Sequence, residues 1–409
     1  MITYLKKMRG QHRNNKRVRD KEKAFIDLRN SAEKSVIQAG RERKYEKRAL
    51  ILPTNSAGQG FAWAGVLSKS GFPTDSLRVV SDNEEYFEST IKIPRLNIVK
   101  YEDRREFAIK LSNEYSYFFW ESLRPLFSFA NKKGIVTASN AVDDISLLKR
   151  AHKKVAVIFH GSDVRDVEHH KKLNSFSPFH DAGDALETVK KRSAELRAQL
   201  PRLNKMRIPL FVTTPDLFHE VPNAKWLPLT IECQKFGEVA SNAPIFQHGG
   251  PPRVLFLPSN SWVKSAHLIT PILQKLHDEG VISWVQTPRI PHDQLPELFK
   301  EVDVLIDQFI GIVGALPLEA MAAGRIVLTH LASWANEALP ELPPVIDITP
   351  NTLEQELREL AKLSEKEITQ RVNSGIEYVN RWHDGNESKK ALLAIIYKES
   401  FFSRVFRKV

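Results

Sequence analysis

The clearest chemical signal lies in DVLIDQFIGIVGALPLEAMAAGRIVLTH (303–330), where an apolar strand leads into a loop carrying Gly311 and Gly314. A short helix is expected to open near Pro317, with Glu319 in its first turn. Backbone N–H groups at a helix N-terminus bind phosphate, and a carboxylate one turn further on accepts hydrogen bonds from the vicinal hydroxyls of a ribose. The segment therefore predicts a nucleotide site. The alternative is that Glu319 only complements its helix dipole and the glycines only turn the chain.

Three further loops place polar or small residues directly after apolar strands. They supply Gly58 and Gly60 (NSAGQGF), His160, Asp163 and Arg165 (HGSDVRD), and Ser259, Asn260 and Lys264 (PSNSWVK). Because doubly wound sheets bind ligands beyond the carboxyl ends of their strands, these loops are expected to line one cleft. Lys264 lies near the start of the following helix, where a cation neutralises a diphosphate and stabilises a departing nucleotide.

Each of these residues also has a purely structural interpretation. Lys264 fits a surface lysine, and His160 fits a histidine whose hydrogen bonds are satisfied inside the fold. Asp163 fits either an acceptor-binding residue or the cap of a helix beginning near Val164. The glycine pair of NSAGQGF fits a tight turn as well as a place where a substrate approaches the backbone.

Two parallel sheets are needed to position these loops, and the apolar runs of the chain predict them. The first block holds ALIL (49–52), LRVV (77–80), LNIV (96–99), YSYFF (115–119), VAVIF (155–159) and IPLFV (208–212). The second block holds RVLFL (253–257), VISWV (281–285), VDVLI (302–306), RIVL (325–328) and PVIDI (344–348). Near-continuous apolar strands separated by helical patterns predict two α/β domains, residues 49–240 and 254–384, with sheets covered on both faces. The proline- and glycine-rich segment 241–253 is the expected linker.

Composition bounds the class of protein. At 409 residues and 42% hydrophobic content, the chain is long enough for two domains with cores of their own. The lone Cys233 excludes an intramolecular disulfide, and no apolar run has the length of a signal peptide or transmembrane helix, so we expect a cytoplasmic protein. Helical periodicity predicts two polar-faced helices at about 352–363 and 365–381 and a third at 387–397.

The charge is concentrated in an N-terminal extension, residues 1–48. It holds 16 of the 60 Lys and Arg and 6 of the 49 Asp and Glu, so it carries +10 of the net charge of +11. Phe25, Leu28, Ala32 and Val36 recur there at roughly helical spacing. The extension fits a solvated helix or partly disordered arm, or a basic arm on anionic lipid at the inner membrane face. RNA or another polyanion is the remaining alternative, and the few aromatic residues argue against binding of single-stranded nucleic acid. The basic, aromatic C-terminal end KESFFSRVFRKV fits either a membrane interface or packing on the body.

Residues 319–324 read EAMAAG after a glycine loop, and this sequence resembles the nucleotide-sugar site of GT-B glycosyltransferases, especially the retaining enzymes of family 4. The resemblance extends over about residues 49–397. It implies an α/β fold of GT-B architecture, in which two doubly wound Rossmann-like domains face a central cleft. It also implies that the last helix, within residues 385–409, crosses back to the N-terminal domain.

The resemblance implies roles for single residues. The donor-binding residues would be Ser259, Asn260, Lys264, Gly311, Gly314 and Glu319, the catalytic residues His160 and Lys264, and the residues of the acceptor side or cleft Gly58, Gly60, Asp163 and Arg165. Glu319 would bind the ribose, and His160 would contact the donor sugar from across the cleft. Two positions depart from the family pattern, because Ser259 stands where relatives have an arginine and Gly311 where many have a second glutamate. The combination of HGSD with DQ…G…G…EAMA resembles a divergent subgroup.

The activity that this resemblance implies is transfer of a sugar from a nucleotide-diphosphate donor to a hydroxyl of a glycan, lipid-linked or polymer acceptor. Anomeric configuration would be retained, with the leaving phosphate helping to deprotonate the acceptor. The expected scheme uses no metal and no cofactor beyond the donor itself. Two alternatives stay open: a GT-B epimerase or hydrolase of sugar nucleotides, and an inactive glycosyltransferase-like partner subunit.

Overall fold

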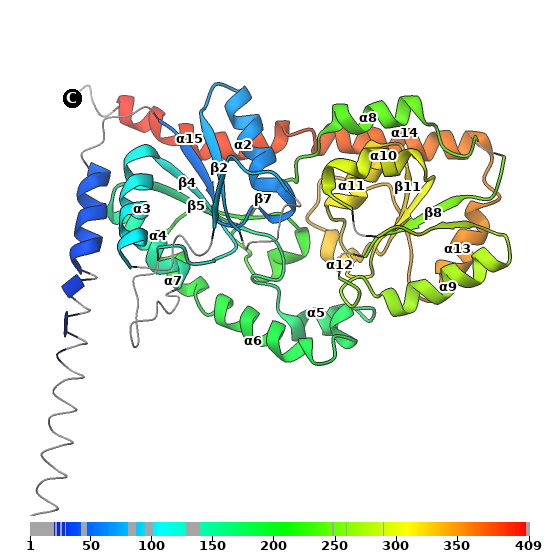
Figure 1. Ribbon diagram of the computed structural model, residues 1–409, viewed down its shortest axis with the longest axis horizontal. Coiled ribbons are helices and arrows are strands. Elements are labelled where there is room, and N and C mark those ends of the chain that lie inside the picture. The colour runs from blue at the N-terminus through cyan, green and yellow to red at the C-terminus, as the bar shows by residue number, and fades with distance from the viewer. Residues whose placement is uncertain are drawn as a thin grey trace, which may run out of the picture.

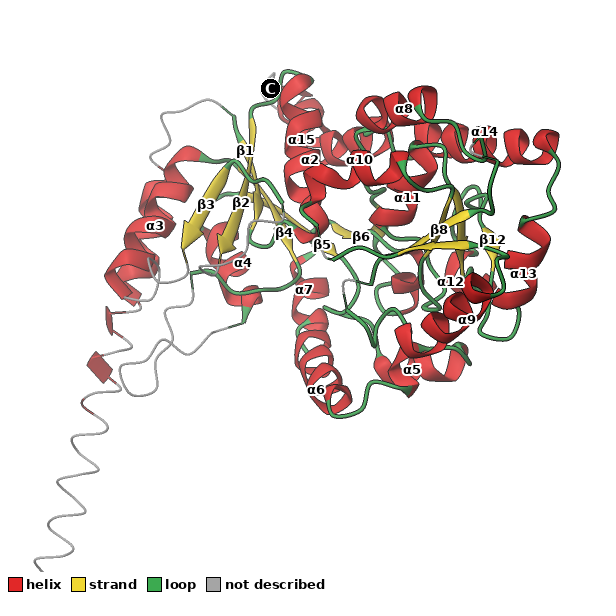
Figure 2. Ribbon diagram, turned by 45° about the vertical axis from the view of Figure 1, so that its right-hand side comes forward, coloured by secondary structure: helices red, strands yellow, loops and turns green. Residues whose placement is uncertain are grey.

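The computed structural model describes residues 20, 23–24, 27–28, 30–41, 47–80, 87–94, 101–127, 140–247, 249–258, 260–288 and 290–405. Within these residues the chain forms two parallel sheets, and helices cover both faces of each (Figure 1). The same layering of strands between helices is visible after rotation in Figure 2. The two doubly wound α/β units predicted from the apolar runs are therefore confirmed.

The first sheet has seven strands in the order β3-β2-β1-β4-β5-β6-β7. They are β1 (Ala49–Leu52), β2 (Thr74–Val80), β3 (Ile91–Pro94), β4 (Tyr117–Glu121), β5 (Lys154–Phe159), β6 (Leu210–Val212) and β7 (Lys225–Trp226). The second sheet has five strands in the order β12-β11-β10-β8-β9. They are β8 (Arg253–Phe256), β9 (Ser283–Val285), β10 (Val304–Ile306), β11 (Ile326–Thr329) and β12 (Ile346–Asp347).

The predicted strands correspond to observed ones with one exception. LNIV (96–99) lies outside the described residues, and β3, which was not predicted, forms an edge of the first sheet. In β3 half-buried residues alternate with exposed ones, so this strand lacks the continuous apolar run that marks the buried strands. Its Pro94 is tolerated because an edge strand needs hydrogen bonds on one side only. β7 was also missed, since it has two residues.

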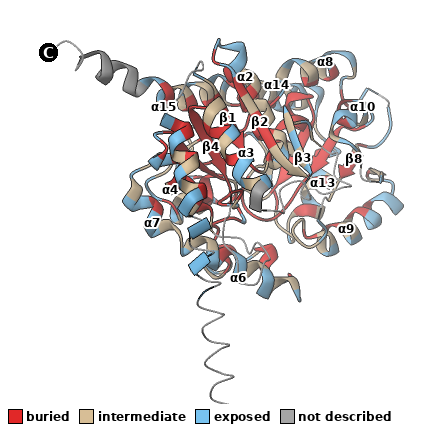
Figure 3. Ribbon diagram, turned by 60° about the vertical axis from the view of Figure 1, so that its left-hand side comes forward, coloured by how far each residue is buried: buried red, intermediate tan, exposed pale blue. Residues whose placement is uncertain are grey.

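Each sheet is packed between two helical layers. The helices are α2 (Gln59–Lys69), α3 (Tyr101–Glu114), α4 (Ala141–Arg150), α5 (Val167–Leu173), α6 (Ala185–Arg197), α7 (Leu200–Met206), α8 (Cys233–Asn242), α9 (Ala266–Asp278), α10 (Leu295–Lys300), α11 (Ala315–Ala322), α12 (Ser333–Asn336), α13 (Leu353–Leu360), α14 (Glu365–Trp382) and α15 (Asn386–Val405). One face of the first sheet packs on α3, α4 and α7, and one face of the second on α9 and α13. The remaining faces share a single apolar cluster with α2, α8, α10, α11, α14 and α15, so one core joins the two halves (Figure 3).

The last helix crosses back to the first half, as predicted. Leu392 and Ile396 of α15 are buried in the same cluster as Trp63 of α2. At the start of the crossing Gly385 has a φ of 92°, and a Cβ there would lie 2.6 Å from Val66. Only glycine fits this turn, because it must adopt a left-handed conformation against another helix.

Part of the basic extension belongs to the folded body. Residues 30–41 form a helix, and its Ala32 and Val36 are fully buried in the core of the first half. A wholly solvated helix is therefore excluded for this segment, although Leu28 is exposed. Phe25 and most of residues 1–29 lie outside the described residues, as do the side chains of the C-terminal KESFFSRVFRKV. Among the described residues, no helix has both the length and the apolar content to span a bilayer.

Candidate functional site

Three of the four predicted loops follow strands that flank the switch points of the two sheets. In each sheet the order of strands reverses direction once, between β1 and β4 in the first and between β8 and β10 in the second. Ligands of such sheets bind beyond the carboxyl ends of the strands that flank this reversal. The loop with Gly58 and Gly60 follows β1, the loop with Lys264 follows β8, and the loop with Gly311 and Gly314 follows β10.

At the edge of the first sheet, His160 is held by a glutamate that sequence reasoning missed. Glu121, the last residue of β4, is fully buried and accepts a 3.0 Å hydrogen bond from Nε2 of His160. Its carboxylate also accepts from the backbone N–H groups of Asn55, at 2.7 Å, and Ser56, at 3.3 Å. The ring of Trp63 stacks on His160 at 5.8 Å between centroids. The imidazole is thus fixed in one orientation with its Nε2 donating to Glu121.

The two glycines of NSAGQGF make room for this arrangement. Gly58 has a φ of 73°, and a Cβ at this position would lie 3.0 Å from the ring of Phe87. A Cβ on Gly60 would lie 3.1 Å from Oε2 of Glu121 and 3.2 Å from the side chain of Asn55. A larger residue at either position would displace the glutamate network or the phenylalanine. Their predicted contact with an acceptor stays a prediction.

The other two polar residues of HGSDVRD are engaged within the first half. The expectation that Asp163 caps a helix near Val164 is wrong, because α5 begins at Val167 and is capped by Asp166. Asp163 instead closes the turn after β5 by accepting from the backbone N–H groups of His160 and Gly161. The carboxylate of Asp163 is thus bonded to N–H groups that precede it and is not available to cap a helix that follows.

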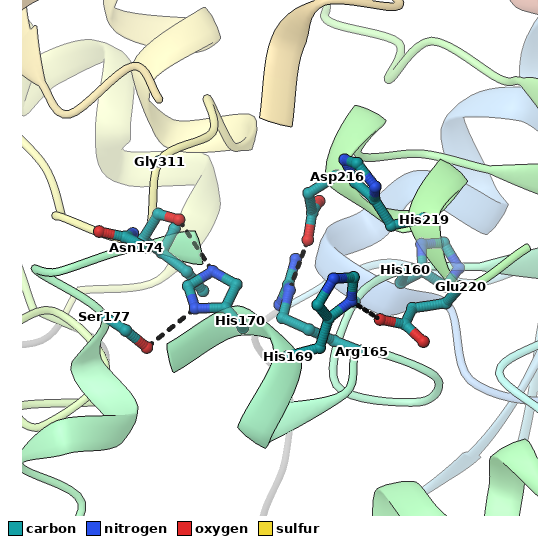
Figure 4. A network of polar contacts seen from close by, with 12 residues as sticks. His160, Arg165, His169, His170, Asn174, Ser177, Asp216, His219, Glu220 and Gly311 are labelled. Carbon is teal, nitrogen blue, oxygen red and sulfur yellow. Dashed lines mark hydrogen bonds and ion pairs between the residues drawn. The ribbon is translucent and has the colours of Figure 1, made fainter. Parts of the chain in front are cut away.

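Arg165 forms a buried ion pair with Asp216. The guanidinium Nε donates to Oδ2 of Asp216 over 2.6 Å, and Figure 4 shows the pair beside His169 and His219. Burial by itself would raise the pKa of Asp216, but the charge and hydrogen bond of Arg165 outweigh it and hold this pKa below its ordinary value. The pair therefore stays ionised near neutral pH and fixes the loop after β5. A direct contact of Arg165 with an acceptor remains a prediction.

At the edge of the second sheet, Lys264 meets the loop that follows β10. Its ammonium pairs with Oδ1 of Asp307, and the two side chains are 14% and 2% exposed. The second carboxylate oxygen of Asp307 is buried and has no hydrogen-bond partner among the described residues. Asn260 is exposed and its carbonyl accepts from the backbone N–H of Lys264, whereas Ser259 lies outside the described residues. The site thus contains a cation whose present partner is only half satisfied.

Helix α11 starts earlier than the sequence suggested. It begins at Ala315 with Gly314 as its cap, so Glu319 lies in the second turn and not in the first. The reason is that Pro317 occupies the third helical position, where its missing N–H has no helical partner to lose. A Cβ on Gly314 would meet no atom within 4 Å, so the start of this helix is open. The placement removes the alternative that Glu319 complements the helix dipole, since that effect is confined to the first turn.

Glu319 is paired with a histidine that the sequence did not point to. Its Oε1 accepts a 2.6 Å hydrogen bond from Nε2 of His292, whose side chain is 29% exposed. Burial would lower the pKa of His292, but the hydrogen bond and charge of Glu319 outweigh it and raise this pKa above its ordinary value. A glutamate that already binds a polarised N–H has the position and acceptor capacity to bind ligand hydroxyls as well.

Gly311 has a backbone conformation and a close neighbour that exclude any side chain at this position. Its φ is 95°, and a Cβ at this position would lie 2.8 Å from Cβ of Ala332. Its carbonyl accepts hydrogen bonds from the backbone N–H of Ala332 and from Nδ2 of Asn336. The second glutamate that many relatives carry at this position therefore cannot be placed on this backbone.

The two edges face each other. The ring of Phe87, from the first half, lies 5.1 Å from that of His292, and Phe179 lies 5.9 Å from Trp262, two residues before Lys264. A pocket between the halves is lined by residues of both: Thr213, Pro215, Trp226, Leu229, Val313, Leu318, Asn336, Leu339, Pro343, Tyr378 and His383. Of these, Thr213 lies 3.5 Å from Nδ1 of His160. Lys264 and Glu319 thus stand on the side of the second sheet that meets the first half.

Two residues of this site were absent from the sequence-based prediction. Glu121 had a readable signal, since a carboxylate at the carboxyl end of the apolar run YFFW stands where site residues are expected. His292 had none, because it lies 27 residues before its partner in a polar loop. In the described part of the chain no three His, Cys, Asp or Glu side chains are grouped as a metal site, and the metal-free scheme stays a prediction.

Comparisons with known proteins bear on the fold. No family model matches this sequence, and a search of curated proteins gives no match. Sucrose-phosphate synthase from Thermosynechococcus elongatus is similar in structure, with a TM-score of 0.57 and 12% identity over 88% of this chain and 100% of that one. A glycosyltransferase from Rickettsia africae gives a TM-score of 0.53 and 11% identity over 87% of this chain and 99% of that one. The chain has the GT-B fold of glycosyltransferases, which confirms the predicted architecture.

Proposed function

We propose that this protein is a glycosyltransferase that moves a sugar from a nucleoside-diphosphate donor to a hydroxyl of an acceptor. The observation that carries the proposal is the meeting of Lys264 with the β10–α11 loop at the switch point of the second sheet. A cation, an open helix N-terminus at Gly314 and a carboxylate at Glu319 follow one another along this edge. Together they match the charges and hydroxyls of a nucleoside diphosphate.

In this proposal the donor replaces the internal partners of the site. The diphosphate takes the ammonium of Lys264 from Asp307 and accepts hydrogen bonds from the N–H groups at the start of α11. The ribose hydroxyls donate to Glu319, which its pairing with His292 holds toward the first half. Asn260 lies on the loop beside the phosphates, where backbone N–H groups serve in place of the arginine that relatives have.

The first half supplies the sugar and acceptor side. His160, fixed by Glu121, faces the donor sugar near the carbon at which the bond is exchanged. The family resemblance supports transfer with retention of configuration, in which the leaving phosphate assists deprotonation of the acceptor hydroxyl. The chemistry then asks the protein for orientation and for charge stabilisation at the leaving group, with no metal and no added cofactor. Glycan, lipid-linked and polymer acceptors, in the synthesis of glycans or cell-surface polymers, all fit this scheme.

A second candidate is an inactive partner subunit of another transferase. It is favoured by one observation: Lys264, Glu319 and His160 all have partners inside the protein. A binding protein would keep the nucleotide site without turnover. Donor binding without any release of nucleotide in the presence of acceptors would favour it.

The basic extension points to a membrane-bound acceptor. Residues 1–19 contain seven Lys and Arg and no Asp or Glu, and Lys or Arg near an anionic surface each contribute about 1 kcal/mol. We expect the full chain to co-sediment with vesicles that contain anionic lipid and not with zwitterionic ones. Deletion of residues 1–19, which leaves the buried Ala32 and Val36 in place, should abolish co-sedimentation. Equal binding by the deleted form would remove peripheral association at the inner membrane face from the proposal.

The central test is nucleotide binding by matched glutamate variants. ADP, CDP, GDP and UDP are screened for an increase in melting temperature, which a ligand selective for the native state produces. Glu319→Ala should weaken binding of the stabilising nucleotide by about tenfold or more, which corresponds to about 1.4 kcal/mol. Glu354→Ala, which breaks exposed ion pairs on α13, is the control and should bind as the wild type does. Unchanged affinity of Glu319→Ala would refute the ribose assignment, and products formed from the donor alone would indicate an epimerase or hydrolase.

A further inference from the structure

A segment of the first half reaches across to the loop after β10. It comprises α5 and the short 3₁₀ helix η3 (Pro178–His180), and Figure 4 shows His170 and Asn174 directed at the neighbourhood of Gly311. Nε2 of His170 donates to the carbonyl of Ile310 over 3.0 Å. Nδ2 of Asn174 donates to the carbonyl of Phe309 over 2.9 Å. Two consecutive carbonyls of one half are thus bound by two side chains of the other.

Both donating side chains are themselves fixed. His170 is 3% exposed, its Nδ1 lies 2.8 Å from Oγ of Ser177, and its ring has edge contacts with Phe179 and Trp334. Burial lowers the pKa of His170 to about 4, so at neutral pH the ring is uncharged, with Nδ1 accepting from Ser177 and Nε2 donating to the loop. Oδ1 of Asn174 accepts from the backbone N–H of Phe176 over 2.8 Å, which sets the direction of its amide donors.

The carbonyls that they bind lie at the centre of the proposed donor loop. Phe309 and Ile310 stand between Asp307, the partner of Lys264, and Gly314, where α11 starts. A shift of these two peptides would move both the carboxylate that Lys264 must leave and the N–H groups that receive phosphate. Buried carbonyl groups keep their hydrogen bonds because an unpaired one is costly, so the loop is expected to follow the donors that hold it.

We infer that His170 and Asn174 are positioning residues for the donor: from the first half they hold the β10–α11 loop in the shape that receives a nucleoside diphosphate. This inference rests on the proposed function of that loop. Neither side chain touches the donor. Donor affinity consequently depends on how the two halves are joined, because part of the support of the donor loop comes from the opposite domain.

An isosteric exchange tests this most sharply. Asn174→Asp keeps the oxygen that accepts from Phe176, but places a carboxylate oxygen where the amide donated to the carbonyl of Phe309. Calorimetric titration with the nucleoside diphosphate that stabilises the wild type most should give at least tenfold weaker binding. His170→Ala should weaken binding to a similar extent, whereas His170→Gln, which keeps an N–H near the position of Nε2, should stay within about threefold of the wild type. His169→Ala is the control, because its ring pairs with Glu220 inside the first half.

A second readout is independent of the donor. Hydrogen exchange at residues 308–314 in the free protein should be faster in Asn174→Asp and His170→Ala than in the wild type and His169→Ala. If the folded Asn174→Asp variant binds the nucleotide as the wild type does, or if its loop exchanges no faster, the inference is overturned. If the wild type binds none of the four nucleoside diphosphates, the proposed function fails, and the exchange measurement alone then decides whether these residues position the loop.

Discussion

The carboxyl edges of the two sheets are built from similar residues but differ in how those residues are satisfied. At the first edge Glu121 receives backbone and imidazole donors and is fully buried, whereas the buried pair of Arg165 with Asp216 leaves Oδ1 of Asp216 without a hydrogen bond in the described structure. At the second edge the side chain of His292 is 29% exposed, and the partner of Lys264 has an oxygen without a hydrogen bond in the described structure. The carboxylate that holds His160 is therefore fully hydrogen-bonded within the fold, whereas the carboxylate that pairs with Lys264 is not.

This difference indicates where a ligand is expected to bind. A carboxylate with one unpaired oxygen beside a lysine offers an acceptor and a cation that can exchange partners when a ligand binds. Asp307 and Lys264 have this character, whereas Glu121 and His160 do not. We expect the second edge to bind the donor and the first edge to orient it.

The largest expected effect comes from removing the cation of the second edge. Lys264→Ala should lower kcat/KM by about a hundredfold, equivalent to about 2.7 kcal/mol, because it removes charge stabilisation of the leaving diphosphate. The same loss should persist in Lys264→Ala combined with Asp307→Asn, which leaves no uncompensated carboxylate in the site. Recovery of activity in the double variant would mean that Lys264 serves only to neutralise Asp307.

A smaller effect is expected from Gly311 and Gly314, which differ in whether their backbone can accept a side chain. Gly311→Ala should destabilise the protein by about 2 kcal/mol, since its φ of 95° and its 2.8 Å approach to Ala332 both exclude a Cβ. Gly314→Ala should change the free energy of unfolding by less than about 0.5 kcal/mol, because its φ is negative and its surroundings are open. Urea denaturation of the two variants measures this. Equal destabilisation would show that Gly311 is not the residue that fixes the loop.

The hydrogen bond from His170 to the carbonyl of Ile310, which joins the two halves, should affect the pH dependence of stability. Because the pKa of His170 is about 4 in the fold and about 6.5 unfolded, only the unfolded state takes up a proton between these values. Stability therefore falls as pH drops from about 6.5 to about 4. His383, whose pKa burial also lowers to about 4, acts in the same direction, and Asp144, whose pKa burial raises to about 7, in the opposite one.

The contribution of His170 to this pH dependence is obtained by comparing the wild type with His170→Gln. Relative to His170→Gln, the wild type should lose on the order of 2 kcal/mol more of its unfolding free energy between pH 7 and pH 4. Denaturant titrations at several pH values provide the measurement, and the contributions of His383 and Asp144 cancel between the two proteins. A difference that does not vary with pH would contradict a buried, neutral His170 at the junction.

Most of the architecture could be predicted from the sequence, because continuous apolar runs such as VAVIF and RVLFL mark strands that are buried on both faces. The loops of the site could be found for the same reason, since they follow those strands. The pairings between these side chains could not be predicted. Glu121 and His160 are 39 residues apart and Lys264 and Asp307 are 43 apart, and the sequence alone does not show which side chains contact each other. The start of α11 was misplaced because Pro317 marks the first turn of a helix without specifying a position within it.

The roles of His170 and Asn174 were beyond sequence reasoning altogether. They act on carbonyl groups 140 and 135 residues away, and a backbone carbonyl carries no residue-specific signal. Polar residues on a short amphipathic helix are ordinarily solvated.

A structure of the protein with a bound nucleoside diphosphate tests the division between the two edges most directly. We expect the diphosphate within hydrogen-bonding distance of Lys264 and of the backbone N–H groups at the start of α11, the ribose on Glu319, and the Lys264–Asp307 pair opened, with Glu121 and His160 unmoved. A nucleotide bound against Glu121 and His160, with Lys264 still paired to Asp307, would contradict it.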